Sequence, residues 1–260
     1  MTLEKLYSFV GNKNKYIIDI GASTCSTNDP VYKFITNNEY KGLCIEGNKD
    51  NIEKLKQGIA NTFEIYDNYI YPDTILEVFE KFNVPIELDI LKIDIDGFDL
   101  EVLRSILGKY KPKIIIAEYN EKIPPPILFE TKYKKDYEWD YSHCFGFSIC
   151  SGKKVMDNYN YTIIKIFELN NILCIQNDIC EQLNISKPNI YDIYNKEYEL
   201  NPRRFRMLPW NENVNYWLTI KDVNILYSEI LNYFTKNNNR SVFENKNKIL
   251  DIDFILKIDN

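Results

Sequence analysis

The chain is poor in the residues that build common metal and disulfide sites. Its 260 residues include one histidine and six cysteines, none of them in a Cys-x-x-Cys pair. A zinc site is therefore not expected, and the cysteines are predicted to be reduced thiols packed as small core residues. No apolar run is long enough to span a membrane, and residues 1–15 lack a signal-peptide pattern. These absences favour a cytoplasmic protein.

Negative charge exceeds positive charge, with 38 Asp and Glu residues against 32 Lys and Arg. The formal net charge is −6 and the isoelectric point is about 5.1, which argues against broad binding to nucleic acid. The composition, with 45% hydrophobic residues, is that of a globular protein that buries a sizeable core. Near the end, residues 235–248 are mostly asparagine, lysine and other polar residues, and they predict a polar loop.

What the sequence does contain is an alternation of apolar runs with segments of helical spacing. Five apolar runs predict strands at residues 16–20, 41–48, 61–70, 86–97 and 111–120. Helical segments lie between them, and together they predict a doubly wound, mainly parallel α/β sheet. Two further strands at 161–178, around an Asn-Asn turn, predict an antiparallel hairpin that completes the sheet.

Beyond the hairpin the α/β alternation stops. We expect a ligand-binding domain at residues 1–180 and a mostly helical or irregular extension at 181–260, which contributes either to the acceptor site or to the contact of an oligomer. The clearest helix of the extension is predicted over residues 221–236, where apolar residues follow helical spacing.

Acidic residues close the predicted parallel strands, at the edge where open α/β sheets bind ligands: Asp19, Glu46, Asp67, Asp94 with Asp96, and Glu118. Gly21 follows the first strand and is expected to let a ligand approach the backbone. A nicotinamide dinucleotide needs three glycines there, but Gly21 is followed by Ala22, Ser23 and Thr24. A nucleoside without phosphates suits the acids better, with Glu46 accepting from ribose hydroxyls and Asp67 from the adenine amino group. S-adenosylmethionine (SAM) has these features.

Several stretches of the sequence resemble the FkbM-like family of SAM-dependent methyltransferases. They are "IIDIGAS", "LCIEGN", "LDILKIDIDGFDLEVLRSI" and "KPKIIIAEYN". The third is the most specific, because the family shows a hydrophobic strand, Lys-Ile-Asp, an acid, Gly and then an acidic helix start with Leu-Arg. The resemblance covers about residues 15–178 and implies a Rossmann-like methyltransferase fold. The first loop departs from the family, since it lacks the second glycine common in SAM sites.

The resemblance implies a set of cofactor contacts: Asp19 and Gly21 at the amino-acid end of SAM, Glu46 at the ribose, Asp67 near the adenine, and Asp94 near the methionine end or the reaction centre. Ala22, Gly47 and Asn48 are further candidate cofactor-binding residues, and Ser23, Thr24 or Ser26 are the candidates for the remaining methionine-end contacts. For Asp94 and Asp96 the alternative is that one of them caps the helix beginning near Phe98.

Removing the proton of an alcohol acceptor calls for a base. His143 and Asp94 are the candidate catalytic residues, with Glu118 as a further base, whereas an acceptor that is already anionic needs none. A structural role for His143 remains open. Glu118, Asn120, His143, Arg204 and Arg206 are the candidate substrate-binding residues. For the two arginines, the alternative is pairing with surface carboxylates of the acidic domain.

A metal ion is not predicted. The acids Asp94, Asp96 and Glu118, with Asn120, are nevertheless chemically suited to Mg²⁺ or Mn²⁺. The sequence as a whole predicts an O-methyltransferase that uses SAM and releases S-adenosylhomocysteine (SAH). The resemblance suggests as acceptor a sugar hydroxyl or phosphoryl group of a capsule-type polysaccharide precursor, which is a small molecule, nucleotide-linked or phosphorylated. The alternatives are a scaffold protein that has lost catalysis and, with less support, a nucleotide-dependent oxidoreductase.

Overall fold

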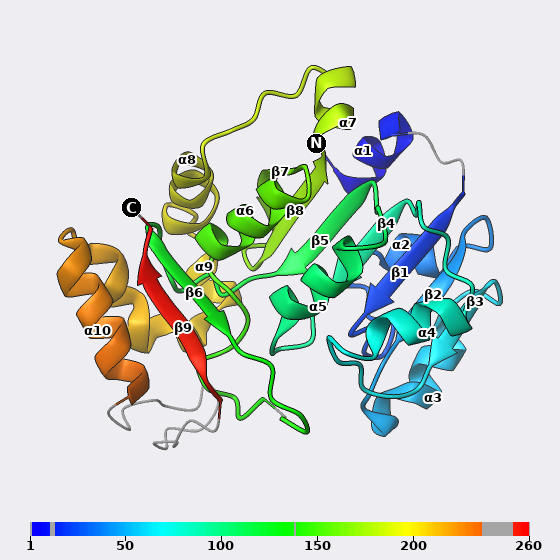
Figure 1. The fold of residues 1–260 in the computed structure, drawn as a ribbon, viewed down its shortest axis with the longest axis horizontal. Coiled ribbons are helices and arrows are strands. Elements are labelled where there is room, and N and C mark those ends of the chain that lie inside the picture. Colours follow the sequence, from blue (N-terminus) through cyan, green and yellow to red (C-terminus); the bar gives the residue numbers. More distant parts are fainter. Residues whose placement is uncertain (1, 11–13, 138, 236–251, 260) are drawn as a thin grey trace.

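The computed structural model describes residues 2–10, 14–137, 139–235 and 252–259. Its centre is a seven-stranded sheet with the order β3-β2-β1-β4-β5-β8-β7 (Figure 1). Five strands are parallel: β1 (Tyr16–Ile20), β2 (Lys41–Ile45), β3 (Phe63–Tyr66), β4 (Ile90–Ile93) and β5 (Ile114–Glu118). The strand β8 (Asn171–Gln176) runs antiparallel to β5 and to β7 (Tyr161–Phe167). The predicted doubly wound sheet with a final hairpin is thereby confirmed.

Helices cover both faces of this sheet, which explains why its strands are apolar throughout. One face packs against α4 (Ile75–Lys81), α5 (Asp99–Leu107) and α6 (Ile149–Asn158). The other packs against α1 (Leu3–Val10), α2 (Tyr32–Ile35), α3 (Lys49–Gly58) and α7 (Asn177–Gln182). The central strand β1 is buried at every position because it lies between these two cores.

The hairpin turn differs from the prediction. Its positive φ angles belong to Glu168 (50°) and Leu169 (77°), whereas Asn171 is a buried strand residue that pairs with Phe167 and Glu118. The predicted position of the turn, at the two asparagines, was therefore wrong by about two residues. Because two successive residues with positive φ suit the twist of a hairpin, the backbone adopts this turn without asparagine or glycine at either place.

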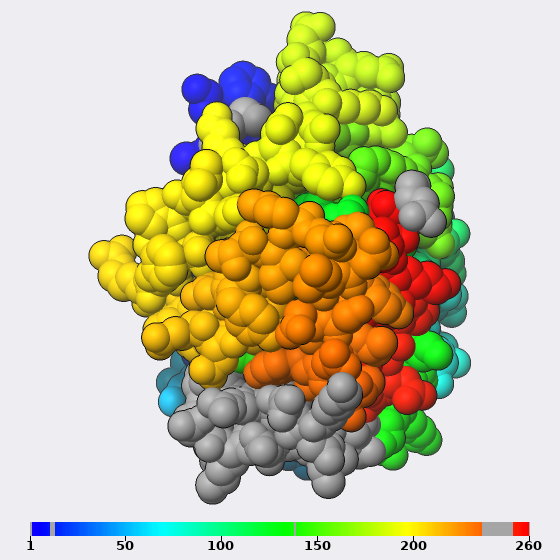
Figure 2. Space-filling view, turned by 90° about the vertical axis from the view of Figure 1, so that its left-hand side faces the viewer, coloured from blue at the N-terminus to red at the C-terminus, as the bar shows by residue number. Residues whose placement is uncertain are grey.

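The C-terminal extension forms a third core with the segment that follows β5. The strand β9 (Phe254–Ile258) pairs antiparallel with β6 (Ile127–Thr131). Against this pair pack α10 (Val223–Thr235) and the 3₁₀ helix η2 (Pro209–Thr219), and Trp217 is fully buried there. Figure 2 shows α10 in orange as the centre of this face, with β9 in red along its edge. The extension therefore covers one end of the sheet.

Shorter elements connect the hairpin to this core: α8 (Ile190–Tyr194), the π-helix η1 (Asn195–Glu199) and α9 (Arg204–Met207). Buried hydrogen bonds fix α8 and η1. The Tyr194 hydroxyl donates to the Glu121 carbonyl oxygen at 2.7 Å, while Asn211 of η2 donates to the Glu121 carboxylate at 2.7 Å and to the Tyr198 hydroxyl of η1 at 3.2 Å. The domain boundary at residue 180 stays a prediction, and most of the predicted polar loop lies outside the described residues. In the described ranges, no helix has the length and apolar character needed to cross a membrane.

Candidate functional site

Gly21 directly follows β1 and packs against the backbone at the end of β4. Its φ is +78°, and a Cβ atom at this position would lie 1.7 Å from the carbonyl oxygen of Asp94. A side chain would therefore collide with the backbone of the neighbouring strand, besides adopting an unfavourable φ. Glycine is required here by strand packing, a reason that differs from the ligand approach expected from the sequence.

Lys92 joins these strand ends through a buried network. Its Nζ atom lies 3.2 Å from Asp19, 3.1 Å from Asp29 and 3.8 Å from Asp94, and it donates to the Gly21 carbonyl oxygen at 2.9 Å. Burial opposes the charge of Lys92, but the three carboxylates outweigh it and hold its pKa well above the usual value. Asp19 is itself fully buried, and burial together with the charge of Asp29 raises its pKa to about 7.

A cavity of about 550 Å³ opens beside this network at the carboxyl ends of β1, β2 and β4. That size is typical of small-molecule sites. The loops after β3 and β4 complete its walls, together with an aromatic segment from the long connection between β6 and α6. The lining residues are Ile20, Gly21, Ser23, Ile45, Glu46, Gly47, Asn48, Asn51, Asn68, Tyr69, Ile70, Tyr71, Asp94, Ile95, Asp96, Gly97, Phe98, Tyr137, Trp139 and Tyr141.

Glu46, directly after β2, is fixed by two backbone donors. Its Oε2 accepts from the Ser23 N–H at 2.7 Å and its Oε1 from the Asn48 N–H at 2.6 Å. A carboxylate has about four acceptor positions, so each oxygen retains capacity for a ligand donor. Asn48 also caps α3, its side chain accepting from the Asp50 N–H at 2.9 Å, and this cap holds the loop that carries Glu46.

The loop after β4 is shaped by Asp99 and not by the two acids considered as caps. The Asp99 carboxylate accepts from the backbone N–H groups of Ile95 at 2.9 Å and of Gly97 at 3.0 Å. Asp96 has a φ of +52°, which turns the chain tightly at the edge of the cavity. The interpretation of Asp96 or Asp94 as a helix cap was therefore wrong, and both carboxylates remain available at the cavity.

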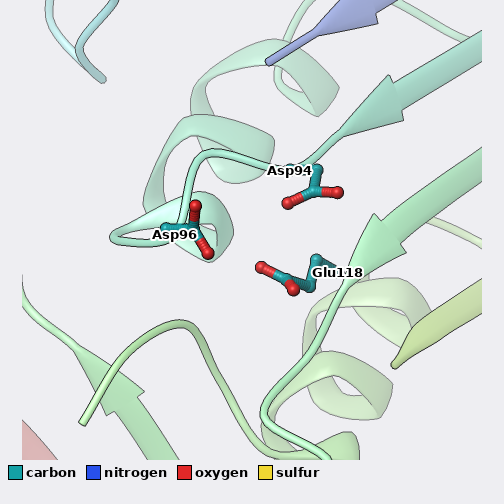
Figure 3. A group of neighbouring side chains, drawn as sticks. All are labelled: Asp94, Asp96 and Glu118. Carbon is teal, nitrogen blue, oxygen red and sulfur yellow. The ribbon is translucent and has the colours of Figure 1, made fainter. Parts of the chain in front are cut away.

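Asp94, Asp96 and Glu118 form an acidic cluster, which Figure 3 shows converging from the ends of β4 and β5. One carboxylate oxygen of each lies within 4.8 Å of the others. Glu118 is only 8% exposed. Burial, together with the charge of Asp94, raises the pKa of Asp96 to about 7 and that of Glu118 well above its usual range.

The predicted cofactor residues divide into two groups. Those in the cavity lining are Gly21, Glu46, Gly47, Asn48 and Asp94. The others lie outside it: Asp19 is in the Lys92 network, Ala22 is fully buried, Asp67 is exposed, and Ser26 accepts from the Asn28 N–H at 3.2 Å. Beside the predicted adenine position, Asn68 and Tyr69 line the cavity where Asp67 was expected.

Of the predicted substrate residues, the structure brings Glu118 alone to the acidic cluster. His143 is fully buried outside the cavity lining, its ring packs 5.9 Å from that of Tyr233, and neither ring nitrogen has a hydrogen-bond partner within the described ranges. Asn120 donates to the carbonyl oxygens of His143 at 2.9 Å and Phe145 at 2.8 Å, so it orders that loop. The cavity geometry therefore gives no direct role to either side chain.

The arginines of the extension also lie outside the cavity lining. Arg204 donates to Asn215 at 2.6 Å and to the Glu199 carbonyl oxygen at 3.1 Å, and its guanidinium covers the Phe205 ring at 4.2 Å. Arg206 is exposed. Arg204 is thus engaged within the extension, and it forms no ion pair with a carboxylate among the residues that the structure describes.

Sequence reasoning missed an aromatic wall on the cavity, formed by Tyr137, Trp139 and Tyr141. The Trp139 and Tyr141 rings lie 5.1 Å apart, and the Trp139 indole donates to the Ser142 carbonyl oxygen at 3.0 Å. Tyr141 is 51% exposed, so the wall ends in solvent. The signal was the clustering of aromatic residues in "YKKDYEWDYS" (133–142), after the last parallel strand.

No protein-family model and no curated protein matches the chain. Similar solved structures include the METTL16 MTase domain (12% identity, 67% of this chain and 66% of that chain, TM-score 0.41). Another is the N-terminal domain of EvdMO1 in the presence of SAH and D-fucose (9% identity, coverage 66% and 81%, TM-score 0.37). A third is an O-methyltransferase family protein from Burkholderia thailandensis (10% identity, coverage 66% and 54%, TM-score 0.38). Similarities this low leave the activity to be argued from the site itself.

Proposed function

We propose that the chain is a SAM-dependent O-methyltransferase of the FkbM-like type. The observation that carries the proposal is the fixed carboxylate of Glu46, which lines the cavity at the end of β2. Two backbone donors hold its oxygens in place while leaving acceptor positions for a pair of ribose hydroxyls. The side chain is therefore organised before a ligand arrives.

In this proposal SAM lies along the carboxyl edge of the sheet. Its ribose binds Glu46, its adenine lies among Asn68, Tyr69 and Ile70, and its amino-acid end lies near Gly21 and Ser23. These residues line one continuous cavity. Asp94 lies in the cavity lining and in the acidic cluster, so it marks the place where cofactor and acceptor meet.

The acidic lining argues against a dinucleotide in the same place. Glu46, Asp94 and Asp96 all line the cavity, and a pyrophosphate would bring further negative charge next to them. SAM carries a positive sulfonium and an ammonium group, which such a lining favours. The proposal therefore ranks SAM above a nicotinamide cofactor.

The transfer itself is a displacement in which an acceptor oxygen forms a bond to the methyl carbon while the carbon–sulfur bond breaks. The sulfonium becomes the neutral thioether of SAH, and the proton of a hydroxyl acceptor passes to a carboxylate of the acidic cluster. The protein contributes alignment and the exclusion of water. A phosphoryl oxygen acceptor would need no proton transfer.

For the acceptor we propose a sugar of a polysaccharide precursor, nucleotide-linked or phosphorylated, modified in the cytoplasm. The aromatic wall supports this choice, because Tyr137, Trp139 and Tyr141 offer flat apolar surfaces beside carboxylates that accept hydroxyl hydrogens. A sugar ring presents both an apolar face and hydroxyl groups. Arg206, exposed on the extension, is a proposed contact for a phosphate group.

Calorimetric titration of the purified chain with SAM, SAH and NAD in parallel tests the cofactor. We expect SAM and SAH to bind and NAD not to. The variant Glu46→Gln should weaken SAM at least about tenfold, since it removes a charged acceptor. Glu53→Gln, an exposed glutamate on α3 paired with Lys56, is the matched control and should bind like the wild type. Binding of NAD alone would overturn the proposal.

Transfer is tested with methyl-labelled SAM and a panel of nucleotide-linked sugars. Recovery of the labelled methyl group on a sugar would support the proposed methyltransferase activity. SAM binding without transfer to any member of a broad acceptor panel would favour the scaffold alternative.

A further inference from the structure

The acidic cluster of Asp94, Asp96 and Glu118 is not explained by the cofactor contacts proposed above. Glu118 lies outside the cavity lining, and neither it nor Asp96 takes part in the Lys92 network. Two parallel strand ends and one tight turn bring the three carboxylates together (Figure 3). Mutual repulsion of three ionised carboxylates opposes this arrangement, so either bound protons or a cation must compensate their charge.

The protein itself supplies little compensation. Lys92 approaches Asp94 at 3.8 Å, farther than it lies from Asp19 and Asp29, and the ion pairs found in the described ranges do not include Asp96 or Glu118. Lys122 is paired with Glu121 at 3.2 Å and lies 4.2 Å over the Phe145 ring. Within the described ranges, no cation of the protein therefore pairs with the charge that Asp96 and Glu118 carry when they are ionised.

A second observation points to a missing partner. The Oε1 atom of Glu118 accepts from Asn170 at 3.0 Å, but its buried Oε2 has no hydrogen-bond partner in the described part of the chain. Figure 3 shows this carboxylate directed at Asp94 and Asp96. A buried carboxylate oxygen without a partner is costly, and such groups usually contact a proton donor or a metal ion.

The spacing suits a small divalent cation. Oxygens that bind one Mg²⁺ at about 2.1 Å lie roughly 3.0 to 4.2 Å apart, and oxygens around the larger Ca²⁺, at about 2.4 Å, lie up to roughly 4.8 Å apart. The three donor oxygens lie within 4.8 Å of one another, so small side-chain rotations complete the site. Carboxylate oxygens are the ligands that Mg²⁺ and Mn²⁺ prefer.

We propose that Asp94, Asp96 and Glu118 bind one divalent cation, Mg²⁺ or Mn²⁺, at the edge of the cavity. Asp94 and Asp96 face the cavity, so the remaining positions of the ion are open to water or to an oxygen of the acceptor. This site goes beyond the proposed methyl transfer, and its carboxylates would bind the ion whether or not SAM is present.

The test uses MnCl₂ alone, followed by electron paramagnetic resonance of free Mn²⁺ in the presence of the full chain without SAM. We expect one Mn²⁺ per chain, displaced by excess Mg²⁺. Glu118→Gln and Asp96→Asn should each weaken Mn²⁺ about tenfold or more, while Glu77→Gln on the exposed face of α4 should match the wild type. Glutamine at position 118 retains an oxygen for Asn170, so this variant should fold.

Two results would overturn the cation site: no binding of Mn²⁺ by the wild type up to about 1 mM, or equal binding by wild type, Glu118→Gln and Asp96→Asn. SAM titration of the same samples in EDTA separates the two proposals. If SAM binds but Mn²⁺ does not, only the proposed cation site is wrong. If Mn²⁺ binds but SAM does not, only the proposed cofactor is wrong.

Discussion

The Nζ atom of Lys92 lies 3.2 Å from Oδ1 of Asp19, and both side chains are almost completely buried between β1 and β4. Because Asp29 and the Gly21 carbonyl oxygen share the same ammonium, one lysine holds together two strands and the loop that leads into α2. The carboxyl edge of the sheet, where the cavity opens, depends on this contact.

Replacing Lys92 by methionine should reduce the free energy of unfolding by about 3–5 kcal/mol, since it leaves buried carboxylates without their cation. Urea denaturation measures the loss. Lys33→Met is the matched control: Lys33 is exposed and its partner Glu4 is only partly buried, so the expected change is below about 1 kcal/mol. Equal effects of the two variants would contradict the role given to Lys92.

Gly21→Ala should destabilise the chain strongly or prevent its folding, because the new Cβ meets the Asp94 carbonyl oxygen in a positive-φ conformation. Gly108 ends α5 with a φ of −63°, and a Cβ there makes ordinary contacts at 3.5 Å. Gly108→Ala should therefore change stability by less than about 1 kcal/mol. Thermal unfolding of both variants compares the two positions, and a stable Gly21→Ala protein would show that the strand ends can separate.

His143 should make stability fall as the pH is lowered below about 6.5. Burial, with a contribution from Lys122, holds the pKa of folded His143 well below its usual value, so the unfolded chain binds one more proton in that range. As the pH is lowered through this range, the free energy of unfolding of the wild type should fall by up to about 1.4 kcal/mol per pH unit more than that of His143→Gln. Urea denaturation of both proteins from pH 8 to pH 5.5 measures the difference, in which the carboxylates common to both cancel.

A constant difference across that pH range would show that His143 titrates normally. His143→Gln also bears on catalysis: unchanged methyl transfer by the folded variant would remove the base role predicted from the sequence.

The six cysteines should react slowly with a thiol reagent in the folded state. All six are buried free thiols, and burial raises the pKa of Cys25 to about 11 and that of Cys150 to about 12. Because the thiolate is the reactive form, the reaction at pH 8 should be more than about tenfold slower than in guanidinium. Rapid modification of one cysteine in the native protein would reveal local opening near it.

Most of the sheet could be predicted from the sequence because its signals are local. Apolar runs and helical spacing predict the parallel strands and the hairpin. The strand β4 nevertheless ends at Ile93, four residues before its predicted end, and Asp96 turns the chain within the segment that was expected to be strand. The pairing of β6 with β9 could not be predicted, since nothing in either segment marks a partner so distant in the sequence.

The acidic residues of the site could be predicted from the sequence, whereas the aromatic wall of the cavity could not. Glu46 and Asp94 line the cavity directly after β2 and β4, whereas in the loop after β3 the lining begins at Asn68, one residue beyond the exposed Asp67. The aromatic wall comes from a loop whose path depends on packing against the extension. His143 was singled out because it is the lone histidine, but its position in the fold is set by burial beside Tyr233.

The pairing of Ile127 with Ile258 also has a consequence for the order of folding. The seven-stranded sheet is complete once residue 176 has been synthesised, but β6 then has an unpaired edge until β9 leaves the ribosome. Closing so long a loop is slow relative to local contacts. The third core is therefore expected to form last, which makes its exposed strand the segment of the nascent chain most in need of a chaperone.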